Sequence, residues 1–80
     1  MIKLSAHAIE MLDMRGIQFA WVQATVERPS ATAVDPRDPT LTRSFRAVPE
    51  AQGRVSRVVH RPAGPDIMVI TAHLDRGARL

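Results

Sequence analysis

The chain contains no cysteine, and its only aromatic residues are one tryptophan and two phenylalanines. Without cysteine, neither disulfides nor thiolate-bound zinc can hold the core together. At 80 residues the chain lies near the lower size limit for a single hydrophobic core. We therefore expect one domain spanning residues 1–80, which association into a homodimer or with a tight partner would help to stabilise.

Long apolar runs and cofactor motifs are also missing. No apolar run near the N-terminus is long enough for a signal peptide or a membrane span, so a cytoplasmic location without membrane association is the default expectation. His7, His60 and His73 lack the spacing of helical metal ligands and have no carboxylate cluster beside them. Neither a P-loop nor a dinucleotide fingerprint is present, and we expect no metal and no other cofactor.

Basic residues outnumber acidic ones, eleven to eight, and every basic residue except Lys3 is an arginine. Arginine binds phosphate through paired hydrogen bonds, which lysine cannot do. The excess lies after Pro36, at Arg37, Arg43, Arg46, Arg54, Arg57, Arg61, Arg76 and Arg79. Such a basic half favours a polyanionic partner, nucleic acid first. The alternative is an ordinary solvated surface rich in arginine, and composition leaves the two readings even.

The hydropathy pattern predicts the element order β-α-α-β-β-β-β. A short strand over residues 1–4 precedes a helix that begins at the N-cap Ser5 and ends at Gly16. A second helix is expected over residues 17–28, and strands over residues 31–35, 41–48, 54–61 and 67–74. Short loops favour an antiparallel meander. The expected fold is α+β, with two helices on one face of a four- to five-stranded antiparallel sheet. The most hydrophobic strand, residues 67–74, is expected in the centre, and residues 75–80 are expected to be frayed or helical.

Two residues of the helices are candidates for function. His7 lies in the first turn of the first helix, where the positive end of the helix dipole disfavours its protonated form. A neutral imidazole there could act as a general base, although a histidine bonded to a backbone carbonyl is the more economical interpretation. Trp21 falls off the apolar stripe of the second helix, so it either packs under a loop or is exposed for a partner.

Polar residues on the strands form a second group of candidates. Thr71 and His73 share one face of the last strand, with Met68, Ile70 and Ala72 expected on the other face. Ser44 with Arg46, and either Arg57 or Arg54, could join Thr71 and His73 on an open sheet face. Such a group would offer cations to a phosphate and a proton donor. A solvated sheet face with ordinary arginines is the alternative, and Arg43 interrupts the alternation on its strand.

The motif Ser5-x-His7-Ala8, followed by Met14-Arg15-Gly16-Ile17, resembles the start of the bacterial family called domain of unknown function 4258. The later Gly53-Arg54 before a valine run, and Val69-Ile70-Thr71-Ala72, resemble two of that family's strands. The resemblance implies a fold like that of the RelE and BrnT toxins and an activity as a metal-independent ribonuclease encoded beside an antitoxin. Carried over by position, the matching polar residues are His7, Arg15, Arg54 and Thr71. The family's helical arginine after the alanine is replaced here by Met11-Leu12.

The leading functional expectation is therefore a toxin-like endoribonuclease that uses the ribose 2′-OH as its nucleophile. RNA would be bound by Arg43, Arg46, Arg57 and His73, and a cognate antitoxin is a possible partner. The alternative is a catalytically inactive relative that binds RNA, or that binds a protein through Trp21 and a sheet edge. DNA reading is disfavoured, because the second helix carries Trp21, Thr25 and Glu27 instead of a basic reading face.

Overall fold

The computed structural model describes residues 1–75, and it confirms the predicted α+β fold and the element order β-α-α-β-β-β-β. The predictions for residues 76–80, including those for Arg76 and Arg79, lie outside the described residues. The elements are β1 (Ile2–Leu4), α1 (Ala6–Arg15), α2 (Phe19–Glu27), β2 (Ala31–Val34), β3 (Thr42–Val48), the single 3-10 turn η1 (Pro49–Ala51), β4 (Arg54–Ala63) and β5 (Asp66–Asp75).

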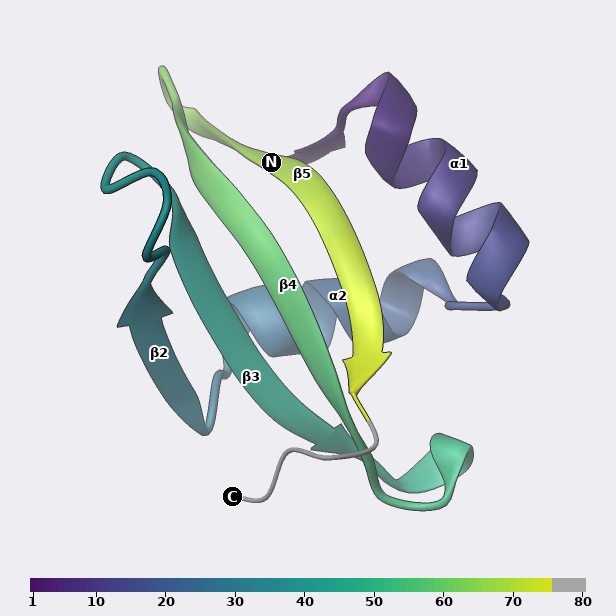
Figure 1. The fold of residues 1–80 in the computed structure, drawn as a ribbon. Coiled ribbons are helices and arrows are strands. Elements are labelled where there is room, and N and C mark those ends of the chain that lie inside the picture. Colours follow the sequence, from purple (N-terminus) through teal and green to yellow (C-terminus); the bar gives the residue numbers. More distant parts are fainter. Residues whose placement is uncertain (76–80) are drawn as a thin grey trace.

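The sheet has the strand order β1-β5-β4-β3-β2, in which β1 pairs in parallel with β5 and all other neighbours are antiparallel. The strand placed in the centre is therefore β4, and the prediction that the last strand is central is wrong. Helix α2 crosses one face of the sheet, whereas α1 stands beside β5 (Figure 1). Helix α1 packs against β5, where Val69 and Ala72 are the fully buried residues of the strand.

Helix α1 begins and ends as its sequence predicts. The Ser5 hydroxyl accepts a hydrogen bond from the Ala8 N–H (3.0 Å), which satisfies one of the unpaired amides of the first turn. At the other end, Gly16 has a φ of 63°, and its N–H reaches the carbonyls of Asp13 and Leu12. This left-handed conformation suits glycine, because a Cβ would strain it.

The helix is fixed along the outer edge of β5 by its own polar residues. The Ser5 N–H donates to the Val69 carbonyl (3.0 Å), and the Ser5 hydroxyl donates to the Ile70 carbonyl (3.1 Å). Ten residues later, Arg15 donates from Nη1 to the Ala72 carbonyl (2.8 Å). Because β1 pairs only with Ile67, Met68 and Val69, these bonds continue the cover of the β5 edge where β1 stops.

The core lies between the helices and one face of the sheet. Its buried members are contributed by both helices, the loop between them and strands β4 and β5, and are Ala8, Ile17, Val22, Val58, Val69 and Ala72. Trp21 is half-buried and packs against this cluster, so its side chain belongs in part to the core. Burial of a valine such as Val58 stabilises the fold by roughly 1.5–3 kcal/mol.

The strand register sorts the polar side chains between the two faces. Val58 pairs with Ala72 on the helix side, so Arg57 and His73, which also pair, face the opposite side. We call this opposite side the open face. Between Val59 and His60 the register shifts by one residue of β5, a bulge that leaves Ile70 without a direct partner.

The bulge changes where the first half of β5 points. Met68 pairs with Arg61, which shares the open face with Arg57. The expectation that Met68 lies on the face opposite Thr71 is therefore wrong, because the extra residue reverses the alternation. The turn that joins β4 to β5 consists of Gly64 and Pro65, and the φ of 61° at Gly64 matches the first position of a type II′ hairpin turn.

Candidate functional site

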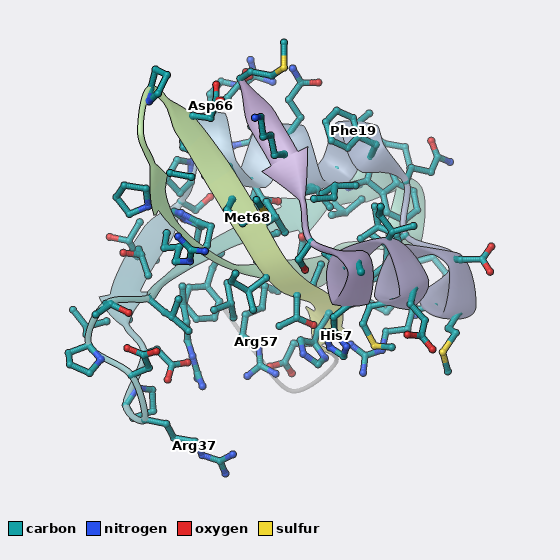
Figure 2. All side chains as sticks on the ribbon, turned by 90° about the horizontal axis from the view of Figure 1, so that it is seen from above. His7, Phe19, Arg37, Arg57, Asp66 and Met68 are labelled. Carbon is teal, nitrogen blue, oxygen red and sulfur yellow. The ribbon has the colours of Figure 1, made fainter. Side chains whose placement is uncertain are left out.

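Basic side chains from α1, β4 and β5 come together at one end of the open face. Arg15 on α1 contacts His73 on β5, with Nη1 at 2.6 Å from Nδ1. Arg57 on β4 is the cross-strand partner of His73. His7 on α1 lies near enough to influence the pKa of His73, and Figure 2 shows His7 and Arg57 on the same side of the molecule. We call His7, Arg15, Arg57 and His73 the basic cluster.

The position of Arg15 follows from the local sequence. The residue ends the last turn of α1, just before the helix stop at Gly16. Ala8 is fully buried, and its small side chain allows the helix to approach the sheet closely. Arg15 therefore reaches the end of β5, where it bonds the Ala72 carbonyl and the neighbouring His73 ring. One side chain thus closes the sheet edge and contacts the candidate site.

Arg15 lies closer to one nitrogen of the His73 ring than to the other. Its Nη1 is 2.6 Å from Nδ1 and 3.4 Å from Nε2. A guanidinium group only donates hydrogen bonds, so a bond from Arg15 to the ring favours an unprotonated nitrogen facing Arg15.

The surroundings of His73 act in the same direction. Burial is the largest cause that lowers the pKa of His73, and the positive charges of Arg15 and Arg57 lower that pKa further. His7 makes a smaller contribution of the same sign, whereas Asp75 raises the pKa. These effects favour the neutral form of the His73 imidazole, beside the guanidinium groups of Arg15 and Arg57.

Unsatisfied polar atoms lie close to this cluster on the open face. Thr71 is two residues from His73 on the same face and pairs with Val59. Its Oγ1 atom is buried and has no hydrogen-bond partner among residues 1–75, and the same holds for Nε of Arg57. Leaving such atoms unpaired costs roughly 1–3 kcal/mol each.

Three of the predicted catalytic residues, His7, Arg15 and Thr71, therefore lie around His73. The fourth, Arg54, does not join them. Its Nε donates to the Ala51 carbonyl (3.2 Å), and it pairs with Val48 at the start of β4. Alternation along β4 turns Arg54 to the face opposite Arg57. Arg57 is thus the arginine that the register brings to His73.

The predicted RNA-binding residues also divide between the faces. Arg46 pairs with Ser56 and therefore lies on the helix side. Ser44, on the same strand, pairs with Val58 and also lies on the helix side, so the expectation that Ser44 and Arg46 join Thr71 is wrong. Arg46 donates from Nη1 to the Arg28 carbonyl (2.8 Å). Arg43 does face the open side, where its Nε is paired with the Asp35 carboxylate (3.0 Å).

A second histidine contact was not anticipated from the sequence. The Ser44 hydroxyl lies 2.8 Å from Nε2 of His60, on the helix side of the sheet. Burial lowers the pKa of His60, which favours the neutral ring. Ser44 is only 1% exposed, so its hydroxyl cannot reach a substrate. We interpret this pair as a structural hydrogen bond. The alternation of β3 and β4 was the only signal in the sequence that could have indicated it.

Within residues 1–75, no three histidine, aspartate or glutamate side chains gather in an arrangement that could hold a metal ion. No helix in the same range is long and apolar enough to cross a membrane. A family model described as "Domain of unknown function (DUF4258)" matches residues 4–73. Searches of curated proteins and of solved structures find no match.

Proposed function

The chain belongs to the DUF4258 family, and we propose that it is a toxin-like endoribonuclease that cleaves RNA at the basic cluster without a metal ion. The observation that carries this proposal is the Arg15–His73 contact with Arg57 and His7 around it. The resemblance of its N-terminal motif to RelE- and BrnT-like toxins supports the same chemistry. A cognate antitoxin is the partner that this proposal implies.

The reaction would begin with attack of the ribose 2′-OH on the adjacent phosphorus. His7 is exposed at the rim of α1, and in this proposal it removes the 2′-OH proton as general base. The bond from phosphorus to the 5′-oxygen then breaks, and that oxygen takes a proton from the protonated His7 or from water. The products are a 2′,3′-cyclic phosphate and a free 5′-OH.

The remaining residues would stabilise the charge that develops on the phosphate. Arg57 supplies a positive charge, and His73 donates from Nε2 to a phosphate oxygen. His73 is not the general acid in this scheme, because the adjacent Arg15 disfavours the imidazolium that a general acid requires. The Thr71 hydroxyl is buried, so in this scheme Thr71 acts only by positioning the neighbouring part of β5 and does not contact the phosphate.

Cleavage of a defined RNA in EDTA tests the proposal, with detection of cyclic-phosphate ends. His7→Asn should lower the rate about 10²- to 10⁴-fold through loss of proton transfer. Arg57→Gln should lower it about 10²- to 10³-fold through loss of charge stabilisation. Arg61→Gln is the matched control, because Arg61 lies on the same strand and face but is exposed and pairs with Met68, away from His73. Absence of cyclic-phosphate products, or equal rates for all three variants, would contradict the proposal.

A second candidate is a binding module without catalysis, and the exposed edge strand β2 favours it. All four of its residues, Ala31–Val34, are exposed, and none of them is charged. Such an edge can accept a strand from a partner protein. A salt titration of RNA binding separates the candidates. Affinity that falls steeply with salt indicates phosphate contacts, whereas a chain that does not bind RNA at all supports the protein-binding module.

A further inference from the structure

A cavity of about 250 Å³ lies on the other side of the sheet from the basic cluster. It is formed by the second half of α2, the end of β3 and the turn η1. Its lining residues that matter here are Trp21, Ala24, Arg28, Arg46 and Glu50. No member of the basic cluster lines it, so the cavity is separate from the site proposed for cleavage.

The walls of this cavity combine one aromatic ring with charges of both signs. Trp21 is half-buried, so its ring is held by the core while it lines the cavity. Arg28 and Arg46 carry two positive charges against the one negative charge of Glu50. The cavity therefore favours a ligand with a flat ring and a net negative charge.

One of the two arginines is held in place by the backbone. Arg46 donates from Nη1 to the Arg28 carbonyl at the C-terminal end of α2, over 2.8 Å. A guanidinium has five N–H donors, so this single bond leaves most of them for a ligand. Fixing the side chain beforehand also lowers the entropy that binding would cost. The arrangement suits a phosphate oxygen.

We propose that this cavity binds a single nucleotide, with guanine as the preferred base. The base would stack on Trp21, and the phosphate would bind Arg46 and Arg28. Guanine carries two neighbouring donors, N1–H and the N2 amino group, which match the two oxygens of the Glu50 carboxylate. Adenine and cytosine each offer one amino donor beside an acceptor, and uracil offers one imide N–H between two carbonyls.

Binding at this cavity does not depend on cleavage at the basic cluster. Trp21 is the single tryptophan of the chain and there is no tyrosine, so its fluorescence reports on the cavity directly. The full chain is titrated with 5′-GMP, 5′-AMP, 5′-CMP, 5′-UMP and sodium phosphate, and the affinities are checked by calorimetry. We expect saturable quenching by GMP with a Kd of about 1 mM or tighter, at least about fivefold tighter than for the other nucleotides, and no response to phosphate.

Variants separate binding in the cavity from effects on the fold. Ala24→Leu fills the cavity and should abolish the response, whereas Ala20→Leu, on an exposed part of the same helix, should retain it. Arg46→Gln should weaken GMP binding at least about tenfold, and Arg37→Gln, an equal charge change in an exposed turn, should not. Glu50→Gln should remove the preference for guanine.

Thermal unfolding of each variant confirms that it is folded before it is titrated. The proposal is overturned if GMP gives no saturable signal, or if phosphate alone reproduces that signal. It is also overturned if folded Ala24→Leu binds as Ala20→Leu does. A chain that binds GMP but cleaves no RNA would refute the ribonuclease proposal and support this one.

Discussion

The two outer edges of the sheet differ in how they are covered. Along β5, the short strand β1 covers the first residues, and α1 then continues the cover with hydrogen bonds from Ser5 and Arg15. Along β2, all four residues are exposed, and the exposed fraction of Val34 is 64%. The same sheet therefore has one edge closed by a helix and one edge available to a partner.

The comparison indicates why the candidate site formed where it did. Closing the β5 edge required a donor at the end of α1, and Arg15 supplies it to the Ala72 carbonyl. The same guanidinium then contacts His73, and its charge adds to burial in lowering the pKa of that ring. At β2 the one ion pair nearby, Asp35 with Arg43, stays within the adjoining turn and strand. The closed edge thus carries both the hydrogen bonds that anchor α1 and the residues of the proposed site, whereas β2 carries neither.

The largest predicted difference between the two edges concerns their valines. Val69 on β5 is fully buried, so Val69→Ala should lower the free energy of unfolding by about 2–3 kcal/mol through lost burial and an unfilled cavity. Val34→Ala on β2 should change it by less than about 0.5 kcal/mol. Urea unfolding at pH 7.5 measures both. Equal losses would mean that the β2 edge is packed as tightly as the β5 edge.

Ser5 and Ser30 offer a smaller test of the same comparison. Ser5→Ala removes the helix cap and the bond to the Ile70 carbonyl, and should cost about 2 kcal/mol. Ser30 precedes β2, is exposed, and contributes a backbone bond to Phe45 that alanine keeps. Ser30→Ala should therefore cost less than about 0.5 kcal/mol. Unfolding midpoints of the pair decide whether α1 is anchored through Ser5.

Arg15 provides a third test, which reads stability and chemistry together. Arg15→Gln should cost about 1 kcal/mol through loss of the bond to the Ala72 carbonyl. It should also raise the pKa of His73 toward its ordinary value, because one nearby positive charge is removed. Titration of the ring by NMR measures this shift. Arg43→Gln, which breaks the ion pair with Asp35 near β2, is the control and should leave the pKa of His73 unchanged. A His73 that titrates identically in all three proteins would refute the role given to Arg15.

The local features of this fold can be predicted from the sequence, whereas its long-range features largely cannot. Ser5 and Gly16 mark both ends of α1 because capping depends on neighbours within one turn. Strand order was misjudged because the apolar run in β5 reports burial, and burial there comes from α1. The bulge at Ile70 places the Met68 side chain on the open face. The hydropathy pattern does not reveal a single extra residue of this kind.

The candidate site was anticipated in part for the same reason. His7, Arg15 and Thr71 were predicted, the first two from a motif confined to one helix. The Arg15–His73 contact joins residues 58 positions apart, and no local pattern indicates it. The choice of Arg57 over Arg54 depends on which face each residue takes. That choice required the register of β4 with β5, which hydropathy does not determine.

The smallest predicted effect is the response of the closed edge to acid. The pKa of His73 is lowered in the folded chain, so the unfolded chain binds more protons once the pH falls below about 6.5. Stability should therefore decrease as the pH falls from 6.5 toward the lowered pKa of His73, and be fully present above 6.5. His60, whose pKa burial lowers, contributes in the same direction.

The two histidines are separated by comparing the wild type with His73→Gln in urea at pH 7.5, 6.0 and 5.0. The variant should lose less stability between pH 7.5 and 5.0 than the wild type, because one of the two acid-sensitive groups is gone. Asp35 and Asp38, between β2 and β3, and Asp66, at the start of β5, have lowered pKa values. They affect stability only below about pH 3.8, so their titration does not overlap with this window. An unchanged slope in His73→Gln would mean that the pKa of His73 is not lowered in the folded chain, and that the two edges respond to acid alike.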